Sequence, residues 1–182
     1  MTDLGSTGDV NATHIKTDLG PVGLLWAEEG LVSLLLGRDK IAESIQASPP
    51  FWLHPLCEKL KRHLSGQEVP DYAEVPLLGG ASPFTERVRA ACRRIPKGQV
   101  RTYGELANEV GSPGGARAVG QVMRKNPFPL IIPCHRVIGA GKNKWFYSAG
   151  GPDMKRALLA LEGGDSLLYS QVSIAPIPQG FP

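Results

Sequence analysis

Cysteine is scarce in this sequence of 182 residues, which contains only Cys57, Cys92 and Cys134. The odd number and the lack of a Cys-x-x-Cys pair argue against a disulfide framework and exclude a zinc deaminase, which needs such a pair. His54 and His63 share one expected helix with Cys57 and do not make a tetrahedral ligand set, so we expect no metal. Unpaired thiols are typical of a reducing compartment, and we expect a cytoplasmic protein.

Long apolar runs are missing as well. No stretch of the sequence reaches the roughly 18 residues that a membrane-spanning helix needs, and no signal-peptide core is present. We therefore expect no association with a membrane. A hydrophobic content of 42% is enough for one large or two small packed domains.

Acidic residues are few in the second half of the chain. Residues 1–85 hold 6 Lys and Arg against 11 Asp and Glu, a net charge of −5, whereas residues 86–182 hold 14 against 6, a net charge of +8. A cationic half suits a polyanion such as DNA, because each phosphate that it neutralises releases counterions. A solvated surface without a partner can carry the same charge, so charge alone leaves both interpretations open.

The first half of the chain predicts a small α/β domain over residues 14–80. Residues 1–13 are polar without periodicity, and we expect a disordered lead-in there. Two apolar segments, residues 22–27 and 31–36, are separated by a short turn that contains Gly30. This pattern predicts the two strands of an antiparallel hairpin.

An amphipathic helix is expected to pack on that hairpin. Leu56, Leu60 and Leu64 recur at every fourth position, with Pro55 at the start and a glycine just past the end. Residues 67–82, which contain proline and glycine, then predict a linker.

The second half predicts a mainly helical domain over residues 81–165. Ser82 as N-cap and Pro83 at the first helical position begin a helix that ends before Pro96. Its apolar face comprises Phe84, Val88, Ala91, Cys92 and Ile95. We therefore expect Cys92 to be a core residue.

Two shorter helices follow. Thr102, with Glu105 three positions later, forms a capping box for a helix that runs to Val110. A glycine-rich turn leads to a second helix that ends at Asn126. Helix, tight turn and helix make the helix-turn-helix arrangement, which many small domains share without binding DNA. Residues 166–182 carry no motif and predict a packed or loose tail.

The most informative segment is the apolar run of residues 127–137, which delivers Cys134 and then His135 and Arg136. A free thiol has a pKa of about 8.5, so little thiolate exists near neutrality unless cationic neighbours lower that pKa. Histidine and arginine are such neighbours by type. For a lone cysteine, the alternative is a buried structural residue at the end of a core strand.

Further motifs surround this segment in a fixed order. They are Thr102–Ala107, Gly111–Gly115, Ala116–Gly120, Asn126-Pro127, Pro133–Val137, Tyr147-Ser148 and Leu158–Gly163. Together they resemble the O6-alkylguanine-DNA alkyltransferases, the self-sacrificing repair proteins that move an alkyl group from guanine to their own cysteine. The match is dense over residues 84–163 and weaker over residues 15–36.

The resemblance implies an α/β amino-terminal domain, with a small antiparallel sheet plus a helix, followed by a mainly helical, winged helix-turn-helix-like DNA-binding and active-site domain. It implies direct reversal of DNA damage. An alkyl group, such as methyl, would pass irreversibly from O6-alkylguanine in double-stranded DNA to Cys134. The resemblance further implies a monomer that binds the minor groove and needs no cofactor.

The resemblance also assigns roles around the nucleophile. His135 would take the thiol proton, and Glu162 would orient the imidazole ring. Neighbouring side chains of an extended strand point to opposite faces, so we expect a water between His135 and the sulfur of Cys134. Asn126 would be the hinge between recognition helix and active-site strand, and the phenol of Tyr103 would donate a proton to the departing guanine.

The charges of the last helix are placed against its dipole. Glu162 sits in its final turn, where a carboxylate is disfavoured, and Lys155 and Arg156 sit near the opposite end, where cations are disfavoured. A compensating partner for Glu162 is therefore expected.

The resemblance places Tyr147 and Ser148 in the substrate pocket, where the serine contacts the guanine oxygen. The family usually carries a glycine where this chain has Trp145, and Ala149 is an insertion. We expect the indole of Trp145 to point inward and narrow the pocket, which favours methyl over benzyl adducts. The alternative is a loop swung outward, with the indole as a lid or a DNA contact.

The attacked carbon lies inside a base stack, so the guanine must leave the duplex. By resemblance, Arg117 would fill the vacated space from the second helix of the motif. Ala116, Ala118 and Gly120 would line the DNA, and Arg124 would contact a phosphate.

Two other functions fit parts of the sequence. A damage-binding protein would flip alkylguanine without transferring the alkyl group, but such relatives lack the cysteine that stands here as Cys134. A cysteine hydrolase has no use for the helix-turn-helix, and no separate histidine has supporting context.

Overall fold

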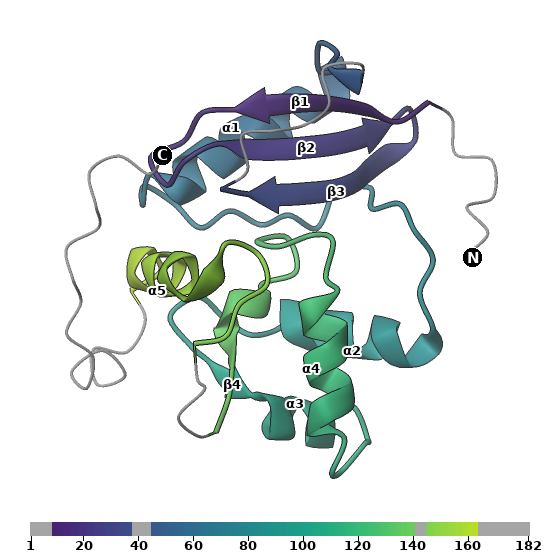
Figure 1. The fold of residues 1–182 in the computed structure, drawn as a ribbon, viewed down its shortest axis with the longest axis vertical. Helices are drawn as coiled ribbons and strands as arrows, with labels where there is room; N and C mark the ends of the chain where they lie inside the picture. The colour runs from purple at the N-terminus through teal and green to yellow at the C-terminus, as the bar shows by residue number, and fades with distance from the viewer. Residues whose placement is uncertain (1–8, 38–44, 141–144, 164–182) are drawn as a thin grey trace. The chain divides into compact units, whose positions relative to one another are not determined.

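The computed structural model describes residues 9–37, 45–140 and 145–163. The chain divides between Gly80 and Ala81 into two compact units. Figure 1 shows a three-stranded sheet with helix α1 in the first unit and a group of helices in the second. Among the described residues, no helix has the length and apolar character that crossing a membrane requires.

The first unit is built on an antiparallel sheet with strand order β1-β2-β3, formed by Asn11–Ile15, Val22–Ala27 and Gly30–Leu36. Ala27 pairs with Gly30, so a two-residue turn closes the hairpin. The predicted hairpin is confirmed. Leu24, Leu31 and Leu34 are buried, which puts apolar side chains of both strands in one core.

The prediction of a disordered lead-in over residues 1–13 is wrong for its last part, because β1 begins at Asn11. Ala12 and Ile15 are buried, and Asn11 pairs with Trp26 of β2. This strand owes its stability to a partner elsewhere in the chain, and five residues with weak alternation do not reveal such a partner. Residues 1–8 lie outside the described residues.

The short turn η2 (Phe51–Leu53) leads into helix α1 (His54–Leu64). The predicted amphipathic helix is confirmed, since its three leucines at fourth positions are all buried. Figure 1 draws α1 behind the strands of the sheet.

The segment after α1, which we expected to be a linker, is partly fixed to the sheet. The N–H of Leu31 donates to the carbonyl of Pro76, and the N–H of Leu78 donates to the carbonyl of Leu31, both over 2.8 Å. A Cβ on Gly30 would lie 2.6 Å from the carbonyl oxygen of Pro76. Glycine is therefore required at position 30 by this close backbone approach.

The second unit packs three helices together, α2 (Pro83–Arg93), α3 (Tyr103–Glu109) and α4 (Ala116–Arg124). The predicted start signals are confirmed, because the hydroxyl of Ser82 accepts from the N–H of Thr85 and the capping box of Thr102 and Glu105 is complete. Cys92 is fully buried among these helices, as expected.

A two-residue parallel ladder completes this unit. Strand β4 (Arg101–Thr102) pairs with β5 (Val137–Ile138), and helix α5 (Gly151–Leu161) follows. The ladder joins the start of α3 to the residues that directly follow the Cys134-His135-Arg136 segment. The tail at 166–182 lies outside the described residues.

Candidate active site

Cys134 lies in a tight turn and not at the end of a strand. Pro133 has φ −77° and ψ 63°, the geometry of an inverse γ-turn, and the N–H of Cys134 donates to the carbonyl of Ile132 over 2.7 Å. Residues Cys134–Arg136 then form the 3₁₀ turn η3. The expectation of an extended strand at Cys134 is therefore wrong. The apolar run that contains Pro133 predicts a strand, but the backbone makes a γ-turn at this proline.

The turn is held from below by the side chain of Asn126. Its Nδ2 donates to the carbonyl of Ile132 over 2.9 Å, and its Oδ1 accepts from the N–H of Phe128 over 3.1 Å. Between these contacts Leu130 has φ 71°, a left-handed conformation that costs about 1–2 kcal/mol for a non-glycine residue. The amide of Asn126 thus fixes a strained loop that leads to Cys134.

The thiol of Cys134 is buried, with only 4% of the residue exposed. Asn126 Nδ2 lies 3.1 Å from its Sγ, and the Sγ lies 3.9 Å from the hydroxyl of Tyr147. Burial raises the pKa of Cys134, and the hydrogen bonds of Asn126 and Tyr147 and the charge of Lys155 lower it in part. The resting thiol is therefore protonated near neutrality, and a base is needed to make it a nucleophile.

Glu162 lies at the C-cap of α5 and joins His135 to Arg136. Its Oε1 is 2.9 Å from Nε2 of His135, and its Oε2 and Oε1 accept from Nε and Nη2 of Arg136 over 2.7 and 2.8 Å. All three residues are buried. The guanidinium compensates the carboxylate that the helix dipole disfavours, and it is the compensating partner expected for Glu162.

This arrangement corrects the expectation that His135 and Arg136 lower the pKa of the thiol. The guanidinium of Arg136 donates to the carboxylate of Glu162 and, through Nη1, to the carbonyl of Ile95 over 2.6 Å. The cation whose charge lowers the pKa of Cys134 is Lys155.

Lys155 is fully buried on α5. Its Nζ donates to the carbonyls of Val137, over 2.6 Å, and of Phe146, over 3.3 Å, and lies 5.8 Å from the centre of the Tyr147 ring. Burial lowers the pKa of Lys155 from 10.5 to about 8, although the charge of Cys134 opposes this effect. Between these values the unfolded chain holds a proton that the folded chain lacks, so this residue makes folding more favourable as pH rises from about 8 to 10.5.

Sequence reasoning missed the role of Lys155 because it treated the residue as a surface cation at a helix start. A signal was available in the spacing, since Lys155 is four positions before Leu159 and lies beside Met154 on the apolar stripe of the helix.

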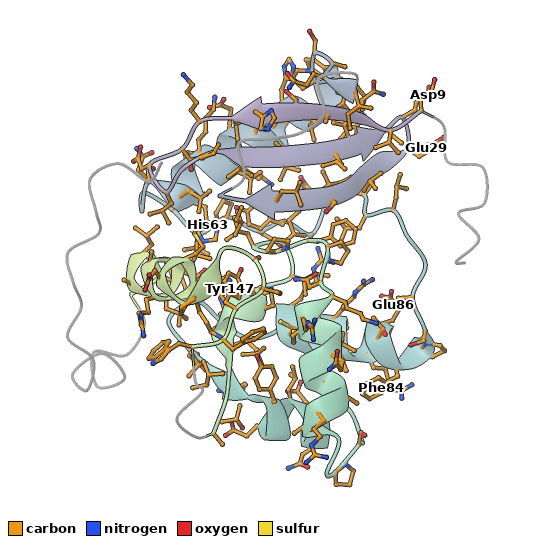
Figure 2. The ribbon with its side chains drawn as sticks, in the orientation of Figure 1. Asp9, Glu29, His63, Phe84, Glu86 and Tyr147 are labelled. Carbon is orange, nitrogen blue, oxygen red and sulfur yellow. The ribbon has the colours of Figure 1, made fainter. Side chains whose placement is uncertain are left out.

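A pocket opens above the sulfur. Its cavity volume is only about 10 Å³, room for about one water molecule and far below the roughly 300–1,000 Å³ of pockets for drug-sized ligands. It is lined by Tyr103, Gly120, Met123, Arg124, Cys134, Phe146, Tyr147 and Ser148. Figure 2 labels Tyr147, which lies in the loop that leads to α5. Three expected site residues, Tyr103, Tyr147 and Ser148, thus meet Cys134 here.

The pocket lining does not support the expected inward placement of Trp145. Phe146 lines the pocket, whereas Trp145 is not among its lining residues in the part of the chain that the structure describes. The guanidinium of Arg156 lies 5.4 Å from the centre of the indole ring, a cation–π distance. This contact with α5 holds the half-buried indole. The sequence predicted that Arg156 lies on a helix but not which side of that helix it faces, so the contact was not expected.

Helix α4 carries the residues that we expected to contact DNA. Arg117, Ala118 and Arg124 are exposed, and Ala116 and Gly120 are half-buried. Arg117, Gly120 and Arg124 stand at spacings of three and four and therefore share one face. A Cβ on Gly120 would meet nothing within 4 Å, so this part of the pocket wall is open space.

Comparison with known proteins identifies relatives of the whole arrangement. Residues 83–164 match the family model described as 6-O-methylguanine DNA methyltransferase, DNA binding domain. A methylated-DNA–protein-cysteine methyltransferase of Mycolicibacterium paratuberculosis is 45% identical over 153 residues, 81% of this chain and 90% of the relative. One of Methanosarcina acetivorans is 38% identical over 156 residues, 81% of this chain and 95% of the relative.

A solved structure of Mycobacterium tuberculosis OGT in complex with DNA has the same fold, with a TM-score of 0.72 and 34% identity. The similarity covers 85% of this chain and 93% of that one.

Replacing Lys155 by methionine should raise the apparent pKa of Cys134, because the variant removes the cation that favours the thiolate. It should also destabilise the fold by about 1–3 kcal/mol, since the buried carbonyl of Val137 and the partly buried carbonyl of Phe146 lose their donor. The measurement is the rate of iodoacetamide labelling of the Cys134 peptide against pH, with urea unfolding alongside. Arg156→Met on the same helix is the control and should leave the labelling profile unchanged. An unshifted profile in Lys155→Met would contradict the assignment.

Proposed function

The chain belongs to the family of methylated-DNA–protein-cysteine methyltransferases, and from this membership we propose that it repairs DNA by transferring an alkyl group from guanine O6 to Cys134. One observation carries the proposal for this chain. The sulfur of Cys134 lines a small pocket together with residues of α4, the helix that also exposes Arg117 and Arg124. A base that leaves a duplex bound along α4 would therefore arrive beside the nucleophile, and the pocket must widen to admit it.

The reaction is a displacement at carbon. The thiolate of Cys134 forms a bond to the alkyl carbon while the bond from that carbon to guanine O6 breaks, and the electron pair stays with guanine. The thiol loses one proton and guanine gains one, so charge and atoms balance. The products are a thioether on the protein and an unmodified guanine in DNA. A thioether is a poor leaving group, so each protein molecule reacts once.

His135 and Glu162 generate the thiolate in this proposal. A carboxylate can only accept, so the hydrogen between Nε2 and Glu162 belongs to the imidazole, and the lone pair of the neutral ring lies on Nδ1. That nitrogen takes the thiol proton through a bridging water, and the carboxylate stabilises the imidazolium that forms. Arg136 keeps the carboxylate in place.

Tyr103 supplies the proton for guanine. It lines the pocket from the first position of α3, where the capping box fixes the backbone. Burial, and then the nearby charge of Cys134, raise its pKa, so the phenol is protonated and can donate to the leaving base.

Double-stranded DNA is the partner, with α4 in the minor groove. Arg117 projects from the first turn of that helix and is exposed, which suits a side chain that fills the space of a flipped base. Arg124 reaches phosphate as well as the pocket. The described cysteines are all free, and a reaction that consumes a thiol is suited to the reducing cytoplasm.

Transfer should stop at one alkyl group per protein, because no described residue is arranged to regenerate the thiol. Intact-mass measurement after mixing with an oligonucleotide that contains O6-methylguanine checks this. Cys134→Ser should abolish the mass gain and retain DNA affinity. Sustained turnover, or alkylation of Cys57 or Cys92 in the native protein, would refute the proposal, and binding without any mass gain would favour a damage sensor.

His135→Ala should slow transfer about 100-fold or more at pH 7, since a positioned general base contributes about 10²–10⁴-fold. The deficit should shrink as pH rises, because the thiol then ionises without help. Tyr103→Phe is the matched control, because the loss of a proton donor is not repaired at high pH. Single-turnover rates from pH 6 to 9 separate the two variants, and parallel profiles would remove the relay from the mechanism.

Arg117→Ala should slow repair of a duplex more than tenfold and repair of the free modified base less than twofold. Only the duplex has to lose a base from its stack, which costs a few kcal/mol, and only there can Arg117 fill the gap. Arg124→Ala provides the comparison. Loss of a phosphate contact should weaken all DNA binding and reduce the salt dependence by about one ion. Equal losses on duplex and free base in Arg117→Ala would indicate a general defect and count against base flipping by this residue.

A further inference from the structure

Phe146 is an apolar side chain in an unusual position. Among the described residues, the large hydrophobic side chains that are exposed are Phe51 and Phe146, with 88% and 61% exposure. Phe51 belongs to the first unit. Phe146 lines the pocket that contains Cys134, so exposed aromatic surface lies at the mouth of the reactive site.

The backbone that carries Phe146 is fixed on both sides. Its carbonyl accepts from the buried Nζ of Lys155 over 3.3 Å. The preceding Trp145 lies against Arg156, and the following Tyr147 is buried beside the thiol. The ring of Phe146 is therefore exposed although its backbone and both neighbouring aromatic side chains are held by contacts within the fold.

We propose that Phe146 is a specificity-determining residue, whose ring forms the stacking wall for planar alkyl adducts on the flipped guanine. The inference rests on the proposed alkyl transfer and adds the class of adduct that this chain prefers. An exposed aromatic ring gains free energy when another planar apolar group covers it, because both lose contact with water. A benzyl group supplies such a plane next to the base, whereas a methyl group covers little of the ring.

The alternatives for this side chain are less consistent with its surroundings. A residue that serves the core would be buried, as Tyr147 is. A contact to DNA phosphates would need a donor or a charge, which phenylalanine lacks. A side chain that plugged the pocket would be enclosed by the pocket walls, yet 61% of Phe146 is exposed.

The test compares single-turnover rate constants for oligonucleotides with O6-benzylguanine and O6-methylguanine. Phe146→Ala should slow the benzyl reaction about three- to tenfold, the range of a lost aromatic pair, and the methyl reaction less than twofold. Phe146→Tyr is the matched control, because it keeps the ring, and should leave the ratio of the two rates unchanged. Phe51→Ala controls for nonspecific effects of exposed apolar surface.

A Phe146→Ala variant with an unchanged ratio, or with a faster benzyl reaction, would overturn the proposal. Methyl transfer by the wild-type protein reports separately on the proposed function. If no transfer occurs, binding of the same oligonucleotides to Cys134→Ser and to its Phe146→Ala double variant, measured by fluorescence anisotropy, decides the matter. The double variant should lose affinity for the benzyl adduct selectively, and equal affinities would reject the stacking wall.

Discussion

The site depends on one buried carboxylate. Glu162 ends α5, and through His135 and Arg136 it fixes the turn that carries Cys134, while Arg136 continues to the carbonyl of Ile95 after α2. Three segments that are distant in sequence therefore meet at one charge. An ion pair in a protein interior survives only when both partners and their hydrogen bonds are complete, and removing one partner costs about 3–5 kcal/mol. Loss of Glu162 should therefore loosen both the turn at Cys134 and the end of the last helix.

The environment of the thiol serves protection as much as reactivity. Burial raises the pKa of Cys134, so the resting sulfur is a thiol with little tendency to react with oxidants or small electrophiles. Asn126, Tyr147 and Lys155 offset part of this penalty without removing it. In the proposed mechanism the nucleophile forms only when His135 takes the thiol proton. The strained backbone at Leu130 is a local cost of holding this geometry.

The parts predictable from sequence were those that depend on near neighbours. The hairpin over β2 and β3, the N-cap at Ser82 and the capping box at Thr102 rest on residues a few positions apart, and these expectations were confirmed. The family resemblance named Tyr103, Tyr147 and Ser148, which line one pocket with Cys134 in the structure. Pairing of β1 with β2, the burial of Lys155 and the contact of Trp145 with Arg156 depend on partners brought near only by folding, so local patterns could not reveal them.

The parallel ladder between β4 and β5 has a consequence for how far the sequence of this unit can change during evolution. Arg101 pairs with Val137 and Thr102 with Ile138, so backbone hydrogen bonds fix the spacing between the residue that begins α3 and the turn at Cys134. Main-chain hydrogen bonds thereby set the distance between the proposed proton donor and the proposed nucleophile, and side-chain replacement hardly alters these bonds. Such a segment can drift widely in surface sequence, or be joined to a new neighbouring domain, and still keep its reactive groups in register.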